Sequence, residues 1–267
     1  GAGRVPAPAA EPPRAPVPAV TVAFLFLAGL AIGSFLNVVA YRLPRGESLA
    51  APPSHCPNCG TPIRWYDNVP VLGWLLLRGR CRACKEPISW RYPAVELATA
   101  VLYALVAATQ DETIRVVLGV LLVTTLVPIT LIDLDTRRIP NAITLPSAIA
   151  ALVAGLALDL DFVPEQLIAG AAAFAFFFAA AYLYPRGMGM GDVKLAGVLG
   201  LYLGRAVAPA IFIALITGVL VGVVIIARVG QEAGRKTAVP FGPFLALGGI
   251  IAFFVGDELV DSYLDHF

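Results

Sequence analysis

The sequence predicts an all-α polytopic membrane protein with about eight transmembrane helices and a small lobe between the first and the second. Hydrophobic residue types make up 58% of the 267 residues and charged types only 14%, against roughly 45–50% and about 25% in soluble domains. The apolar residues gather in runs that are long enough to cross a bilayer, which takes roughly 20 residues each. All four cysteines lie in one large polar insert, residues 42–93.

This composition excludes several classes of protein. A soluble enzyme would leave the apolar excess facing water, whereas a bilayer replaces water as the solvent of the outer surface. A disordered chain and a disulfide-stapled mini-protein are excluded for the same reason. The apolar composition indicates the lipid bilayer as a partner. The net charge of +1 provides no general basic field that would attract nucleic acid, so we expect no nucleic-acid partner.

The chain divides into a tail, a first span, the lobe and a membrane domain. Residues 1–19 are rich in Pro and Ala and predict a disordered tail. Residues 20–41 form an apolar run that is too long for a signal-peptide core and has no charged n-region, which indicates a retained span. The lobe occupies residues 42–93, a seven-helix domain occupies 94–260, and 261–267 form a C-terminal tail. The seven later spans are expected near 94–110, 114–132, 142–158, 164–184, 193–204, 206–228 and 242–260.

The placement of charge predicts the orientation of these spans. Basic residues near span ends stay on the cytoplasmic side of a membrane. If both termini lie outside, 15 of the 19 Lys and Arg residues fall in the inner segments 42–93, 133–141, 185–194 and 228–239. Adding or removing one span would reverse everything after it. We therefore expect eight spans, with both termini outside and the lobe in the cytoplasm.

The lobe contains two C-x2-C pairs, Cys56 with Cys59 and Cys81 with Cys84, and 21 residues lie between the two pairs. Each pair can place two thiolates on one tight turn, and two such turns make a tetrahedral sulfur site that suits zinc. Four unliganded cysteines are the alternative, since disulfides are not expected in a reducing cytoplasm. Four thiolates close the coordination shell, so the zinc is expected to be structural.

Acidic residues at membrane depth are costly and require an explanation. Asp133 and Asp135 end the third span. At positions i and i+2 of a helix they lie about 200° apart, so only one of them faces a given partner. We expect the outward one to form an interfacial salt bridge with Arg137 or Arg138.

Asp192 follows the run Gly187-Met-Gly189-Met-Gly191. Glycines at alternate positions let a backbone approach another helix or a substrate strand closely. Asp192 is expected at or near the N-terminus of the sixth span, where the helix dipole favours its anion. Capping that helix is the alternative role.

Two helices thus each bring one carboxylate to the cytoplasmic edge of the membrane. Two close carboxylates share a proton, so one acts as base on a water while the other polarises a carbonyl. This is the chemistry of peptide hydrolysis without a covalent intermediate. The two histidines of the chain, His55 and His266, lie outside the expected spans, so no Ser/His/Asp arrangement competes.

Glu96 lies just inside the second span and Asn37 lies in the first. We expect the two to form a buried hydrogen-bonded pair that fixes the helix register, with a functional role for Glu96 as the alternative.

These motifs together resemble those of the prepilin peptidases, the bifunctional leader peptidases and N-methyltransferases of type IV pili and type II secretion. The resemblance covers roughly residues 25–255. It rests on the first-span segment Gly33–Arg45, the two C-x2-C pairs with Trp65–Pro70 between them and Arg91–Glu96 after them, and the segments Asp133–Asn141, Gly189–Asp192 and Pro240–Phe244.

The resemblance implies a membrane aspartic endopeptidase of the bacterial inner membrane with its active site on the cytoplasmic side. Its substrates would be type IV prepilins and type II secretion pseudopilins, cut after a glycine that follows a short basic leader. S-adenosylmethionine would then methylate the new N-terminal residue, with the lobe as the methyltransferase-associated part. Asp133 and Asp192 would be the catalytic pair, with Gly189 and Gly191 as the supporting loop. Asp133 is preferred to Asp135 because it takes the first position of its motif.

Two other classes of function stay open. One is the same peptidase without methylation, against which the cysteine lobe argues. The other is a non-enzymatic membrane protein, a transporter or a zinc scaffold. A transporter would use Asp133, Asp192 and Glu96 as a cation path and would contain an internal repeat, and the two halves of the sequence share no motif.

Overall fold

The structure is a computed structural model that describes residues 18–184, 188–230 and 239–266. Most of the tail expected over residues 1–19 and Gly187 of the glycine run lie outside these residues. The described part has no β-strand; it contains helices and two isolated β-bridges, His55 with Pro62 and Arg80 with Pro87.

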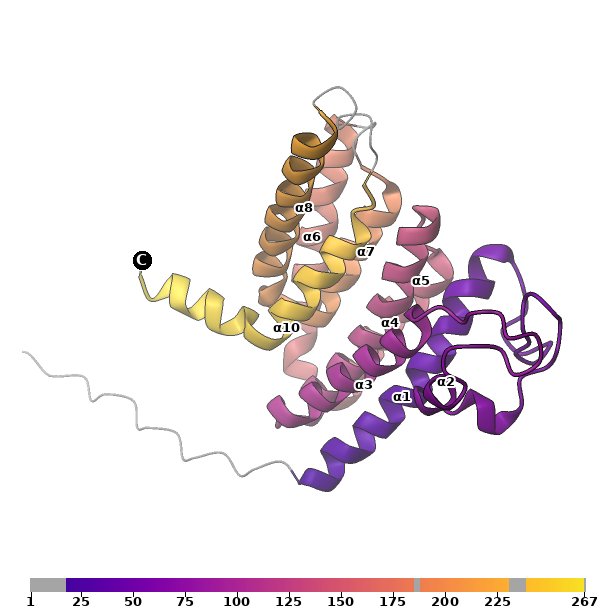
Figure 1. The fold of residues 1–267 in the computed structure, drawn as a ribbon. Coiled ribbons are helices and arrows are strands. Elements are labelled where there is room, and N and C mark those ends of the chain that lie inside the picture. The colour runs from indigo at the N-terminus through magenta and orange to yellow at the C-terminus, as the bar shows by residue number, and fades with distance from the viewer. Residues whose placement is uncertain (1–17, 185–187, 231–238, 267) are drawn as a thin grey trace, which may run out of the picture.

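Eight helices of at least 14 residues follow the apolar runs of the sequence within the described residues (Figure 1). They are α1 (Ala19–Arg42), α3 (Arg91–Thr109), α4 (Thr113–Thr136), α5 (Asn141–Leu158), α6 (Val163–Leu183), α7 (Met190–Leu203), α8 (Val207–Val229) and α10 (Gly242–Leu264). Four boundaries differ from those expected by three residues or more. Helix α4 ends at Thr136 rather than at 132, and α7 begins at Met190 rather than at 193. Helix α3 already begins at Arg91, inside the segment assigned to the lobe, and α10 continues to Leu264, so the segment expected as a C-terminal tail is largely helical.

Seven helical segments of the described chain are long and apolar enough to cross a membrane. One of them, Met190–Arg228, has 39 residues and contains both α7 and α8. The chain reverses between these two helices at η4 (Gly204–Ala206), where Gly204 has a φ of +56°. A side chain at this position would also collide with the Glu165 carboxylate, so the reversal requires glycine. The predicted fold class is therefore confirmed, and α7 and α8 are separate helices that together make up one of these seven segments.

The helices form two groups that meet at α4 and α5. Figure 1 shows α6, α7, α8 and α10 together in one half and α1, α3, α4 and α5 in the other, and α10 packs against α4. Leu118, Leu122, Leu126 and Ile129 of α4 are each at most 1% exposed. Their spacing of three and four residues places them on one face of the helix, so α4 is the centre of the apolar core.

The two ends of the bundle are distinguished by their polar contacts. The end of α4 and the starts of α5 and α7 line a common cavity, and α10 begins with a bond to α4 at that end. At the opposite end, the starts of α4 and α6 and the segment between α7 and α8 meet the C-terminal part of α10. Successive helices of this domain therefore run in alternate directions, as membrane spans do.

Residues 43–90 form the lobe, which Figure 1 shows beside α1. It contains only short elements, η1 (Leu43–Arg45), η2 (Trp65–Asn68) and α2 (Leu72–Leu76). Its buried residues are Cys56, Gly73 and Gly79. The buried guanidinium of Arg42, at the end of α1, donates to the backbone oxygens of Ser48 and Pro52 at 2.9 and 2.7 Å. The lobe thus has almost no apolar core and depends on polar contacts.

Candidate active site and metal centre

Asp133 and Asp192 line one cavity of about 790 Å³, and Asp135 does not. Asp133 lies in the last turn of α4 and is 5% exposed, and Asp192 lies in the first turn of α7. Their carboxylates are near enough to interact electrostatically. The rest of the lining comes mainly from the connection between α4 and α5 and from the start of α7. The structure therefore brings together the two carboxylates that the sequence analysis selected.

The Asp133 carboxylate is oriented by the start of α10. Its Oδ2 accepts a hydrogen bond from the backbone N–H of Gly242 at 2.9 Å. A β-carbon at position 242 would lie only 2.7 Å from that oxygen, so the contact requires glycine. The sequence analysis gave Gly242 no role. The Pro240–Phe244 segment, which contains Gly242, was one of the motifs of the sequence analysis. Nothing in its own sequence indicates that it contacts a residue 109 positions earlier.

The Asp192 carboxylate turns back over the first turn of α7. Its Oδ2 accepts the N–H of Gly189 at 3.3 Å, so it satisfies one of the free N–H groups at this helix start. Asp192 is the third residue of α7, and the N-cap position itself is occupied by Gly189. Gly191 permits a close approach, since a β-carbon there would lie 2.9 Å from Cβ of Ile139. Ile139 belongs to the connection between α4 and α5, so the segment that approaches Gly191 closely is a loop of this chain rather than another helix.

Asp135 points away from the cavity and forms an ion pair with Arg91. Its Oδ1 accepts from Nη1 of Arg91 at 2.8 Å, and Nη2 of Arg91 donates to the Leu131 backbone oxygen at 3.2 Å. The expectation of a salt bridge to Arg137 or Arg138 was wrong, because Arg137 ends the helix in the left-handed conformation and both arginines line the cavity. The pair joins the start of α3 to the end of α4.

Glu96 and Asn37 do not bond to each other, so the expected pair is wrong; the Glu96 carboxylate instead has the Ser34 side chain of α1 as a partner besides a backbone N–H. Glu96 Oε2 accepts the N–H of Val71 at 2.7 Å, and Asn37 Nδ2 donates to the oxygens of Gly33 and Tyr92. Val71 has a φ of +61°, which is strained for a β-branched residue. Because Val71 lies in the lobe and Glu96 in α3, their hydrogen bond anchors the lobe to α3.

The four cysteines converge, as their spacing predicts. Their Sγ atoms all lie within 4.8 Å of one another. The Sγ atoms of Cys56 and Cys84 are 3.8 Å apart and those of Cys59 and Cys81 are 4.0 Å apart. A tetrahedral zinc site with Zn–S bonds of about 2.3 Å has sulfur–sulfur edges of about 3.8 Å. The donor set and its dimensions therefore fit a metal ion with four thiolate ligands.

The two cysteine turns share one backbone design. The N–H of Gly60 bonds to the oxygen of Cys56 at 2.9 Å, and the N–H of Lys85 bonds to that of Cys81 at 3.1 Å. Gly60 and Lys85 both have positive φ, +69° and +62°. Each turn then closes with a bond from the N–H of its first cysteine, to Thr61 or to Glu86. The C-x2-C spacing thus corresponds to two equivalent turns, each presenting two thiols to the same centre.

The thiols differ in acidity because each has different neighbours. Hydrogen bonds with the side chain and backbone of Thr61 lower the pKa of the Cys59 thiol to about 6. Backbone N–H groups of Cys84 and Ala83 lower the pKa of Cys81. The N–H of Glu86 would lower the pKa of Cys84, but desolvation and the adjacent thiols Cys59 and Cys81 outweigh it, and the pKa rises to about 11. Four thiolates at this spacing require a cation between them.

The chain is similar to known proteins over most of its length. Residues 27–110 match the family described as Bacterial Peptidase A24 N-terminal domain, and residues 120–226 match the Type IV leader peptidase family. Three relatives named "Prepilin leader peptidase/N-methyltransferase", from Aeromonas hydrophila, Pseudomonas putida and Myxococcus xanthus, are 34%, 35% and 38% identical to the chain. The similarity covers 94%, 92% and 80% of this chain and 96%, 94% and 65% of those proteins.

No solved structure matches the chain significantly. The first two relatives are matched over nearly their whole length, and the two family matches together include both the cysteine cluster and the carboxylate cavity. On this evidence the chain belongs to the type IV leader peptidase family.

Proposed function

We propose that this protein is a membrane aspartic endopeptidase that removes the short basic leader of type IV prepilins and type II secretion pseudopilins after a glycine, and then methylates the new N-terminal residue. One observation carries the peptidase activity: Asp133 and Asp192 come from separate helices and line the same cavity. The relatives, named as leader peptidases and N-methyltransferases, support the substrate class and the second activity.

In the proposed mechanism the two carboxylates act as an acid and a base. One carboxylate takes a proton from a water, and the protonated partner donates a hydrogen bond to the scissile carbonyl. Gly242 holds one oxygen of Asp133, and Gly189 holds one oxygen of Asp192, so each carboxylate has a second oxygen free for the water or the carbonyl. These two backbone contacts also limit the rotation of both carboxylates.

The lobe, residues 42–93, is the proposed methyltransferase-associated part, and 94–260 is the proposed protease domain. Cys56, Cys59, Cys81 and Cys84 would hold a structural zinc ion that supplies the lobe with the organising centre that its apolar residues do not. S-adenosylmethionine would supply the methyl group. The lobe contributes only Pro44 to the lining of the carboxylate cavity, and we assign no residue to this cofactor.

The protein is proposed to lie in the bacterial inner membrane with both termini outside and the carboxylate cavity on the cytoplasmic side. Arg137, Arg138 and Lys194 lie around this cavity or at the start of α7. At the opposite end of the described bundle the basic residues are Arg115 and Arg205, and both are neutralised in ion pairs with acids of α10. This asymmetry supports the orientation.

The proposed function predicts a change at the N-terminus of a candidate prepilin co-expressed with this protein. Mass spectrometry is expected to find the leader removed after a glycine and the new N-terminal residue methylated. A strain without the protein provides the unprocessed mass. A trimmed but unmethylated terminus would favour the peptidase-only alternative, and an intact leader would contradict the proposal.

The orientation predicts which positions an impermeant thiol reagent reaches in spheroplasts. Asp161, between α5 and α6, and Glu47, in the lobe, are both exposed. We expect Asp161→Cys to react from outside, and Glu47→Cys and the native cysteines to react only after the membrane is permeabilised. Labelling of Glu47→Cys but not of Asp161→Cys in intact spheroplasts would reverse the proposed orientation.

A further inference from the structure

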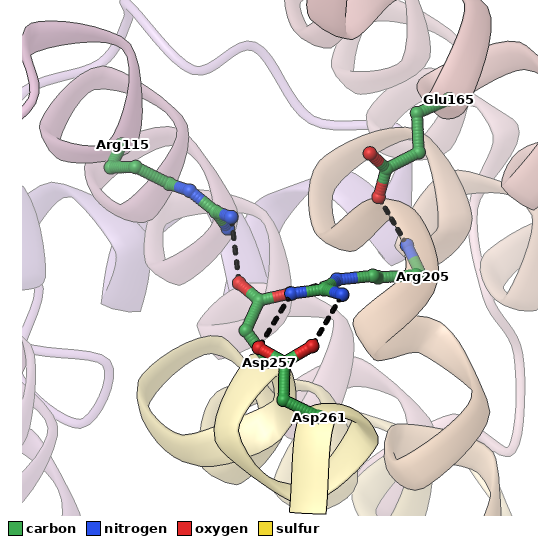
Figure 2. Close-up of polar contacts among 5 residues, drawn as sticks. All are labelled: Arg115, Glu165, Arg205, Asp257 and Asp261. Atoms are coloured by element: carbon green, nitrogen blue, oxygen red, sulfur yellow. Dashed lines mark hydrogen bonds and ion pairs between the residues drawn. The ribbon is translucent and has the colours of Figure 1, made fainter. Parts of the chain in front are cut away.

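A cluster of charged residues joins helix ends on the side of the bundle opposite the carboxylate cavity (Figure 2). Asp257 of α10 accepts from Nη2 of Arg115 at 2.6 Å and from Nε of Arg205 at 3.2 Å. The guanidinium of Arg205 also makes two hydrogen bonds to Asp261, at 2.6 and 2.9 Å. The backbone N–H of Arg205 donates to Glu165 at 2.7 Å. We call these residues the far-end cluster.

The cluster joins the same helices whose other ends build the cavity. Arg115 lies in the first turn of α4, whose last turn carries Asp133. Arg205 lies two residues after the end of α7, whose first turn carries Asp192. Asp257 lies on α10, which starts with the Gly242 N–H bound to Asp133. With a rise of 1.5 Å per residue, the cluster lies about 20–27 Å from the carboxylates along these helices.

Helices α10 and α5 are both shared neighbours of the two aspartate helices. Each packs against α4 and α7, which make few direct contacts with each other. A β-carbon on Gly249 of α10 would lie 2.7 Å from a Leu199 methyl of α7 and 3.4 Å from a Leu126 methyl of α4. The position of α10 therefore contributes, together with that of α5, to the separation of α4 from α7, and hence to that of Asp133 from Asp192.

The contacts of the cluster are suited to fixing the position of α10 relative to α4 and α7. An isolated exposed ion pair contributes little to stability, but Asp257 is shared by two arginines from different helices. The side chains of Arg115 and Asp257 are only 25% and 32% exposed. Asp257 and Asp261, four residues apart, lie on one face of α10, and the two bonds of Arg205 to Asp261 fix the direction of approach. The contacts therefore restrict both the rotation and the position of α10.

We propose that the far-end cluster, centred on Asp257, is a positioning device for the leader-peptidase site. It holds α10 between α4 and α7 so that Asp133 and Asp192 keep their working separation. A displacement of about 1 Å in reacting groups can lower a rate by roughly 100-fold. The cluster includes no residue of α1, α3 or the lobe, so its loss affects the peptidase and leaves the methyltransferase intact. This inference rests on the proposed function.

The test compares the two activities in variants of the full-length protein reconstituted in vesicles. Asp257→Asn keeps the shape of the side chain and removes the shared charge. We expect kcat for leader cleavage to fall by about 10- to 100-fold, with little change in KM. Methylation of a separately supplied, already cleaved pilin and the zinc content should not change. Asp257→Glu, which keeps the carboxylate, should recover most of the cleavage rate.

Two further variants complete the test. Glu258→Gln removes an exposed acid at the next position of α10, outside the cluster, and should leave both activities at the wild-type level. Arg115→Gln removes only the α4 arm and should lower kcat for cleavage by a smaller factor than Asp257→Asn. Normal cleavage by Asp257→Asn, or an equal loss of cleavage and methylation in both cluster variants, would overturn the inference. Absence of cleavage by the wild-type protein would instead contradict the proposed function.

Discussion

Asp133→Asn and Asp192→Asn are each expected to abolish leader cleavage, with losses of roughly 100- to 10,000-fold or more, because an amide cannot take or give the proton. Both variants should fold normally. An asparagine oxygen at 133 still accepts the N–H of Gly242, and one at 192 still accepts that of Gly189. Since the two carboxylates act as one unit, the double variant should be about as inactive as either single variant.

Asp135→Asn is the matched control for this experiment. Asp135 lies two residues from Asp133 on the same helix, but it pairs with Arg91 outside the cavity, so the variant should retain substantial activity. Cleavage is measured on a purified prepilin, and the zinc content reports that each variant is folded. If Asp135→Asn is inactive and Asp133→Asn is active, the catalytic assignment is wrong by two residues. Normal cleavage by both Asp133→Asn and Asp192→Asn would contradict the aspartic-protease mechanism.

Loss of the metal ligands is expected to have the second large effect. The purified protein should contain about one zinc per chain, with four sulfur ligands near 2.3 Å in X-ray absorption spectra. The double variant Cys56→Ser/Cys84→Ser should lose this metal. Because the lobe buries only Cys56, Gly73 and Gly79, metal binding supplies most of its folding free energy, about 10–16 kcal/mol in zinc-finger peptides. We therefore expect methylation to be abolished.

His55→Ala is the control for the metal prediction. His55 adjoins Cys56 and is a potential ligand by type, but the metal-binding group in the described residues consists of the four cysteines, and Nδ1 of His55 lies 3.1 Å from the Pro53 oxygen. This variant should keep its zinc and its methylation activity. A folded, active preparation of the wild-type protein without metal would contradict the zinc assignment.

Short-range patterns in the sequence were sufficient for much of this account. Apolar runs predicted the spans because a helix needs roughly 20 residues to cross the bilayer, whatever surrounds it. The C-x2-C spacing predicted the cysteine turns because each turn closes within its own segment, from Cys56 to Thr61 and from Cys81 to Glu86. The cost of acids at membrane depth drew attention to Asp133, Asp135, Asp192 and Glu96, and the family resemblance selected Asp133 and Asp192 among them. The structure places these two in one cavity.

Contacts between distant segments could not be predicted from the sequence. The partner of Asp135 is Arg91, 44 residues earlier, rather than the adjacent Arg137 or Arg138. Glu96 binds the N–H of Val71 and not Asn37. For Asp135 the adjacent arginines were the wrong choice, and for Glu96 the true partner is a backbone N–H in the lobe, which no side-chain pattern indicates. Helix rotation and the path of the lobe determine which group faces which.

The length and apolar character of each helix and the two cysteine turns were already determined by local spacing. The orientation of the Asp133 carboxylate was determined by α10, whose Gly242 donates to it and whose Asp257 joins α4 to the turn after α7. Apolar runs of similar length are interchangeable as spans, so they carry no information about their neighbours. Which helix lies between the two aspartates depends on complementary packing and charge over the whole bundle, and these exist only once the helices are assembled.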